Sequence, residues 1–256
     1  MAWQIFVHSV RQVFGNLEGS LRVSAVLTIV QAVITLALGQ FVLGDPVSLQ
    51  TRMLEGNFDW ASYVIVLVMQ LLLGLWIAVG WHRYVLTNEV PGLVPRLHLD
   101  RVMGYFGKSV LIGLFLLPLL MFGSLVVAMF VAPLFRGQIE AQPFLHLLAM
   151  GLLIYVPVAT VALRLSTALP GVALKAGVSV FAGWQATVGQ TGVMLGLVLL
   201  SVVGWLVLGL PSMFVFAPGS VVGLIWQFVT QWVGVMVGAS ILTTLYGHYV
   251  EGRPLV

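Results

Sequence analysis

Histidine is the side chain best suited to acid–base or ligand chemistry near neutral pH, and the sequence contains five. If the apolar segments described below cross a membrane, His8, His82, His98 and His248 lie on one side and His146 on the other. His82 and His248 end predicted helices at similar depth, so a bis-imidazole haem or metal site is one interpretation. The pattern favours a simpler role, because polar and cationic side chains at helix C-termini anchor a helix at the membrane interface. We therefore expect no cofactor and no metal.

Other reactive groups are scarce. The chain has no cysteine, which excludes disulfides, thiolate catalysis, iron–sulfur clusters and thiolate zinc sites. No Asp, Glu, Lys or Arg lies at the centre of a predicted span, and such residues usually mark proton or ion pathways. The polar side chains at mid-span are predicted to form hydrogen bonds between helices, with a polar ligand as the alternative: Gln31, Gln70, Thr160, Gln227 and Gln231. We expect that the protein is not an enzyme.

Composition places the chain in a membrane. Of 256 residues, 60% are hydrophobic and only 7% are charged, against roughly 25% in a soluble domain. The mean hydropathy is +1.09. A water-exposed surface could not be covered by so few charges, so lipid must solvate much of it. The pI near 9.5 reflects a net charge of only +3 and does not suggest nucleic acid as a partner.

Charge-free stretches define the membrane spans. About 20 apolar residues cross the hydrocarbon core, and the last uncharged run, 176–250, must fold back on itself. Pro211, Ser212, Pro218, Gly219 and Ser220 supply the turn. The sequence predicts an all-α, polytopic bundle of six transmembrane helices in one integral membrane domain, 1–256. The predicted spans are 22–44, 60–82, 109–135, 142–164, 190–211 and 221–248.

The cations orient these spans. With the N-terminus inside, nine of the eleven cations lie on the inner side: Arg11, Arg22, Arg83, Arg96, Arg101, Lys108, Arg164, Lys175 and Arg253. Only Arg52 and Arg136 lie outside. We therefore predict a multi-pass protein of a bacterial inner membrane with both termini in the cytoplasm. Six inner cations are predicted to contact anionic lipid head groups or a partner: Arg83, Arg96, Arg101, Lys108, Arg164 and Lys175.

A three-fold rhythm underlies the spans. Short, weakly amphipathic segments, 3–20, 97–109 and 178–191, precede spans one, three and five. The stretch 13–21 aligns with 102–110 without a gap. One interpretation is three helical hairpins, each preceded by an interfacial helix. The alternative is the rhythm that any membrane protein built of hairpins shows.

Small residues and prolines suggest how some helices pack. Two small-xxx-small pairs on spans five and six predict close packing between these helices: Gly192 with Gly196, and Gly234 with Gly238. Pro118, Pro133 and Pro157 lie in spans three and four and are predicted to bend them.

Two motifs carry a resemblance. Trp81-His-Arg-Tyr-Val-Leu86 is followed by Glu89 and Pro91, and Arg164-Leu-Ser-Thr-Ala-Leu-Pro170 is followed by Ala173 and Trp184. Together they resemble six-span inner-membrane proteins of alphaproteobacteria, distantly similar to YciC-type proteins and to the membrane domain of some glycerophosphodiesterases. The resemblance implies a six-span membrane fold and no enzymology, because the phosphodiesterase catalytic domain is absent.

Three functions stay open at this point. The leading one is a non-catalytic accessory protein that binds, organises or helps assemble a larger inner-membrane complex, with membrane lipids as further partners. The second is a carrier or channel for a lipid or apolar small molecule, with a cavity near Pro118 and Pro157. The third is a haem- or quinone-binding subunit that uses His82 and His248.

Overall fold

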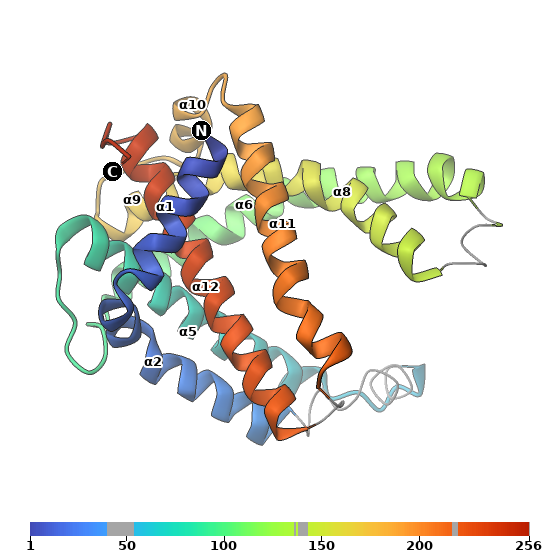
Figure 1. Ribbon diagram of the computed structural model, residues 1–256, viewed down its shortest axis with the longest axis horizontal. Helices are drawn as coiled ribbons and strands as arrows, with labels where there is room; N and C mark the ends of the chain where they lie inside the picture. Colours follow the sequence, from blue (N-terminus) through green and yellow to red (C-terminus); the bar gives the residue numbers. More distant parts are fainter. Residues whose placement is uncertain (40–53, 136, 138–142, 217–219, 256) are drawn as a thin grey trace.

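The computed structural model describes residues 1–39, 54–135, 137, 143–216 and 220–255 of the chain (Figure 1). Within these residues the protein is all-helical and forms no strand. Six of the described helices are long and apolar enough to cross a membrane. The predicted fold class, a polytopic bundle of six transmembrane helices, is confirmed.

The spans extend beyond the charge-free stretches. Several helices continue into polar sequence, where backbone hydrogen bonds still form: the first begins five residues before 22, and the second ends five residues after 82. The spans are α2 (Leu17–Ile34) with a π-helical end η1 (Thr35–Gly39), α5 (Trp60–Thr87), α6 (Leu99–Val126) with η2 (Val127–Val131) and η3 (Ala132–Phe135), α8 (Pro143–Ser166), α11 (Thr191–Phe214) and α12 (Val221–Tyr249). The predicted span end at 40–44, the span start at 142, Arg52, Arg136, Pro218 and Gly219 lie outside the described residues.

Helix ends follow from local side-chain chemistry. Asn16, Asp59 and Ser220 each accept a hydrogen bond from the backbone N–H three residues later, which caps α2, α5 and α12. Asn88 ends α5 in the left-handed conformation, with φ of 55°. These caps place the ends of the spans close to polar residues that can remain in water.

Three shorter helices lie beside the spans. Helix α1 (Ala2–Phe14) buries Ile5, Ser9 and Val13, one residue per turn, and packs against α11 and α12. Helices α9 (Leu169–Ala173) and α10 (Val180–Ala186) precede α11. Short helices therefore stand before spans one and five, as expected. Before span three the structure differs, because residues 99–109 form the first turns of α6 itself.

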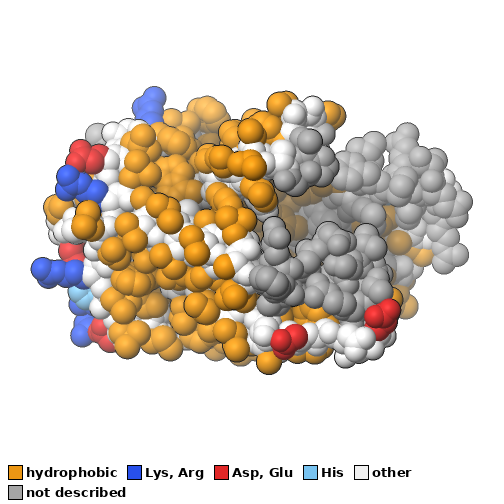
Figure 2. Space-filling model, turned by 90° about the horizontal axis from the view of Figure 1, so that it is seen from below, with side chains coloured by type: hydrophobic (Ala, Val, Ile, Leu, Met, Phe, Trp, Pro, Cys, Tyr) orange, Lys and Arg blue, Asp and Glu red, His pale blue; other side chains and the backbone are white. Residues whose placement is uncertain are grey.

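The described helices meet at one end of the bundle and diverge toward the other (Figure 1). In Figure 1, α6 and α8 run together to the right, whereas α2, α5, α11 and α12 descend away from them. We call the end where all of them meet α1, α9, α10 and both termini the cationic end, and the opposite end the splayed end. Figure 2 shows Lys, Arg and His side chains gathered at one edge and an apolar surface over most of the described face.

Candidate functional site

The predicted cations divide into two groups. Arg96 and Lys175 are exposed, and Lys175 pairs with Asp100 at 3.2 Å. The other four are at least partly buried and donate to the backbone of the segment that joins α8 to α11: Arg83, Arg101, Lys108 and Arg164. The exposed pair has ready access to solvent, and contact of the six cations with lipid head groups or a partner stays a prediction.

One backbone carbonyl oxygen accepts hydrogen bonds from two of these arginines. Arg83 from α5 and Arg101 from α6 both donate to Ala173 O, at 3.0 and 2.8 Å. Ala173 is the last residue of α9, where the helix dipole is negative. Lys108 donates to Val178 O a few residues later. The cations therefore hold the α9–α10 segment against the spans.

Arg164 holds the same segment from α8. Its guanidinium lies 3.6 Å from the ring centroid of Trp184, and its Nη2 donates to Trp184 O at 3.1 Å. Nε donates to the Thr187 hydroxyl, also at 3.1 Å. Only 7% of Arg164 is exposed, so these contacts are shielded from water. A stacked, hydrogen-bonded arginine of this kind positions the α10 segment.

A carboxylate balances part of this charge. Glu89 pairs with Arg83 and with His98, whose Nε2 lies 2.9 Å from its Oε1. Burial alone raises the pKa of Glu89, but the hydrogen bonds and charges of His98 and Arg83 outweigh it and hold the pKa below its ordinary value. The loop after α5 is therefore closed by an ionised carboxylate.

The expected interfacial role of His82 is wrong. α5 continues to Thr87, so His82 lies inside the helix and is fully buried against α6 and α12. Its Nδ1 lies 2.8 Å from Thr243 Oγ1 and its Nε2 lies 3.2 Å from the Tyr105 hydroxyl. Because the Thr243 hydroxyl donates to Ala239 O, it accepts from Nδ1–H, and the Tyr105 hydroxyl then donates to Nε2.

This arrangement leaves His82 poorly suited to bind a metal. Both ring nitrogens already have partners. His248 Nδ1 instead bonds Arg253 O at 3.1 Å. No group of three or more His, Cys, Asp or Glu residues that could hold a metal ion occurs in the part of the chain that the structure describes.

The glycine pairs contribute unequally to packing. Gly234 lies directly under the Trp205 ring, so it does bring α12 against α11. Gly196 meets Ala2 of α1 instead, with the Cβ of Ala2 2.8 Å from where a Gly196 Cβ would be. The positions of Gly192 and Gly238 open onto empty space.

Two of the mid-span polar residues do join helices. Gln31 Nε2 donates to Gln70 O at 3.0 Å, and Gln70 Nε2 donates to Gln31 O at 2.9 Å, which ties α2 to α5. Thr160 bonds its own helix at Val156 O. Gln227 and Gln231 are exposed on α12. The expectation of interhelical bonding is confirmed for the first pair.

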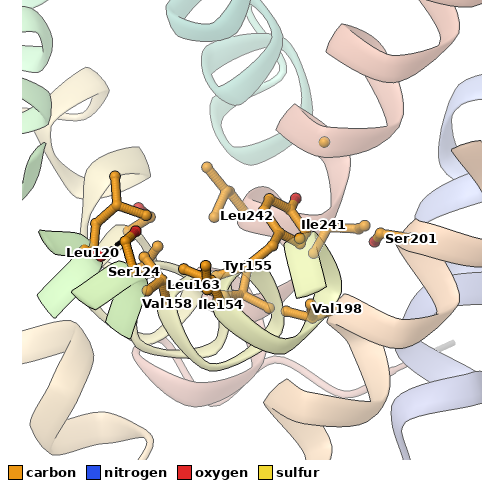
Figure 3. A pocket seen from close by; sticks show the side chains of 15 residues that line it. Leu120, Ser124, Ile154, Tyr155, Val158, Leu163, Val198, Ser201, Ile241 and Leu242 are labelled. Atoms are coloured by element: carbon orange, nitrogen blue, oxygen red, sulfur yellow. Dashed lines mark hydrogen bonds between the residues drawn. The ribbon is translucent and has the colours of Figure 1, made fainter. Parts of the chain in front are cut away.

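A chamber lies where the helices diverge. It has a volume of about 640 Å³ and lies between α6, α8, α11 and α12 (Figure 3). Leu120 and Ser124 of α6 form one wall, and Val198 and Ser201 of α11 face them across α8. The predicted location near Pro118 and Pro157 is close, because these prolines lie on the two helices that leave the bundle here.

One face of α8 forms the floor of this chamber. The lining residues recur at intervals of three and one, as a single helix face does: Gly151, Ile154, Tyr155, Val158, Ala159, Ala162, Leu163 and Ser166. At 1.5 Å per residue the floor is about 22 Å long. Small side chains at 151, 159, 162 and 166 keep it open. That stripe could be read from the sequence, but its opposite walls depend on how the helices cross.

The chamber is apolar in effect. Two of its hydroxyl groups are satisfied within their own helices, because Ser124 donates to Leu120 O and Ser201 to Leu197 O, both at 2.8 Å. No charged side chain is among the described residues that line it. A ligand in such a space would be held by shape and apolar contact.

Comparisons with models of protein families, with curated proteins and with solved structures found no match to this chain. The resemblance to YciC-type proteins and to the glycerophosphodiesterase membrane domain stays a prediction.

Proposed function

We propose that this protein is a non-catalytic membrane protein that binds a lipid or another apolar molecule between α6, α8, α11 and α12, as a carrier of that molecule. The observation that supports this proposal is the chamber of about 640 Å³, which is in the size range of ligand sites. Its length along α8 and its uncharged lining suit an extended hydrocarbon chain.

Selectivity in such a site comes from packing. Transfer from bilayer to chamber gains little hydrophobic free energy, because lipid tails are already apolar. The gain must come from close contacts that fluid lipid does not provide. A chamber with a defined floor and walls provides them.

Native mass spectrometry in mild detergent tests the proposal. We expect the purified protein to carry about one lipid per chain. Ala159→Phe fills the chamber and should abolish the bound lipid. Val68→Phe, on a lipid-facing position of α5, is the matched control and should retain it. A wild-type protein that carries no lipid, or an Ala159→Phe variant that carries as much as the control, would overturn the proposal.

An accessory role is the second candidate, and a groove of about 490 Å³ between α2 and α12 favours it. Ala25, Thr28 and Ala32 form its small-residue side on α2, while Phe228 and Trp232 stand along α12. Small residues allow another helix to approach closely. A partner subunit that co-purifies at fixed stoichiometry, and is lost in an Ala25→Leu, Ala32→Leu variant, would support this role.

Orientation is part of the proposal. The described cations gather at one end, and we propose that this end faces the cytoplasm of a bacterial inner membrane, where Arg96 and Lys175 meet anionic lipid. The test is a C-terminal fusion to a reporter that is active only outside the cytoplasm. Activity of this reporter would contradict the proposed orientation.

A further inference from the structure

A second chamber adjoins the first. It has a volume of about 430 Å³ and lies between α1, α11 and α12, with Phe6 and Phe14 of α1 on its wall. Ser201, Gly238 and Ile241 line both chambers. These three residues therefore stand between the two spaces, where α11 and α12 run side by side.

We call the stretch around Ser201 and Gly238, which lies between two packed borders, the window. Toward the cationic end, Met194 and Leu197 of α11 pack in one buried cluster with Ile241 and Leu245 of α12. These four side chains form the inner border. Trp205 of α11, which lies against Gly234 of α12, is eight residues beyond Leu197, or about 12 Å along the helix.

The outer border lies toward the splayed end. There Trp205 covers Gly234, and Trp226 Nε1 donates to Leu208 O at 3.0 Å. Between the borders stand Ser201, whose hydroxyl turns back to its own helix, and Gly238, whose Cβ position is open space. Small residues thus keep the window open.

We infer that the two chambers form one continuous site for a single long, unbranched acyl chain that passes through this window. The inference rests on the proposed lipid binding and specifies its ligand. No charged residue lines either chamber among the described residues, so the part of the ligand inside is uncharged. Two chambers in series, joined at small residues, match a flexible chain, whereas a rigid ring system that fills the first chamber ends there.

Chain length is then the selected property. A chain that ends in the first chamber makes no contact in the second. A longer chain fills the first chamber, of about 640 Å³, and also makes contacts in the second, of about 430 Å³. Gly238 is the residue that permits this gain, so it determines specificity without contributing polar contacts.

A chain-length series tests the inference. Binding of saturated fatty acids from laurate to behenate is measured on the full-length protein in detergent, by displacement of a fluorescent fatty acid. Wild type should bind behenate about tenfold more tightly than laurate, after correction for partition into micelles. Gly238→Leu should remove this preference, because behenate then binds no more tightly than laurate. Ser201→Leu narrows the window from α11 and should likewise remove the preference for behenate.

Gly192→Leu is the control, because this glycine also faces open space but lines neither chamber. Equal affinity across the series in wild type, or a length preference that survives in folded Gly238→Leu and Ser201→Leu proteins, would overturn the inference and leave lipid binding intact. Failure of wild type to bind any fatty acid, together with no co-purified lipid, would instead remove the proposed function.

Discussion

The cationic end and the splayed end hold their helices by different means. On α6, the buried residues Val102, Tyr105 and Ile112 all lie in the first half, whereas most large apolar side chains from Leu114 to Leu125 are exposed. The cationic end has apolar clusters, buried hydroxyls and arginines bound to backbone carbonyls. At the splayed end, Trp205 lies on Gly234 and Trp226 donates a hydrogen bond to Leu208 O.

This difference indicates a division of labour. A rigid cationic end fixes the angles at which α6 and α8 leave the other spans. The space between the diverging helices has its apex on this buried core. Stability should therefore depend on the cationic end and ligand binding on the chamber, and the following substitutions test this separation.

The largest loss of stability is expected from Gly183→Val at the cationic end. A Cβ at Gly183 would lie 2.7 Å from Arg164 O and 2.8 Å from Ala168 N, which are backbone atoms that cannot move aside. Overpacking of this kind should lower the free energy of unfolding by about 3 kcal/mol. Thermal unfolding in detergent, followed by circular dichroism, measures it. Gly192→Ala, in open space, should stay near wild type; comparable melting of the two variants would contradict the compact arrangement around α10.

Arg164→Leu should have the next largest effect. It removes the stacking on Trp184 and the hydrogen bonds that the guanidinium donates to Trp184 O and to the Thr187 hydroxyl, for a loss of about 2 kcal/mol. Arg164→Lys retains the charge but not the planar stack, so it should restore only part of the loss. Arg96→Gln, at an exposed cation, should change stability by less than about 0.5 kcal/mol. Unfolding monitored by tryptophan fluorescence distinguishes these outcomes, and full rescue by lysine would show that charge alone matters.

Glu89→Gln tests the ionic part of the cationic end. Because the pKa of Glu89 is lower in the folded protein, its ion pairs stabilise the fold above its ordinary pKa of 4.5, and this stabilisation is lost as the pH falls through the folded value. At neutral pH the variant should be less stable by about 1 kcal/mol. Wild type and variant should converge in acid. A stability difference that persists at low pH would refute the ionic explanation.

The sequence predicts the spans well and their contacts unevenly. Asp59 predicts the start of α5 at Trp60 because charge and cap coincide at one residue. The burial of His82 leaves no such mark, since Tyr105 and Thr243 are 23 and 161 residues away. Hydrogen bonds from arginines to backbone carbonyls cannot be predicted from the sequence either, because every residue has a carbonyl. A cation that has no nearby carboxylate suggests contact with lipid head groups instead.

The chamber also could not be predicted from the sequence alone. The stripe of small residues on α8 is visible in the sequence, but small stripes usually mark helix contacts. The stripe on α8 forms the floor of a cavity because of the angles at which the helices cross at the cationic end. The sequence predicts the faces of helices, and long-range packing decides which faces meet.

The smallest effect, below about 1 kcal/mol, is expected from Gln70→Leu between the two regions, because the change also removes the buried Gln70 Oε1, which accepts no hydrogen bond from the described residues. This change removes two hydrogen bonds donated by the side chain, to Gln31 O and to the Thr35 hydroxyl, both at 2.9 Å. Hydrogen bonds between membrane helices contribute about 0.6 kcal/mol each, because the unfolded chain in lipid also finds partners. Gln227→Leu, exposed on α12, provides the matched control and should leave stability unchanged or raise it. Stability in mixed micelles titrated with denaturing detergent measures both. A loss for Gln70→Leu as large as that for Arg164→Leu would mean that polar ties also hold the helices together deep in the membrane, and the contrast between a fixed end and a loosely joined one would no longer describe the protein.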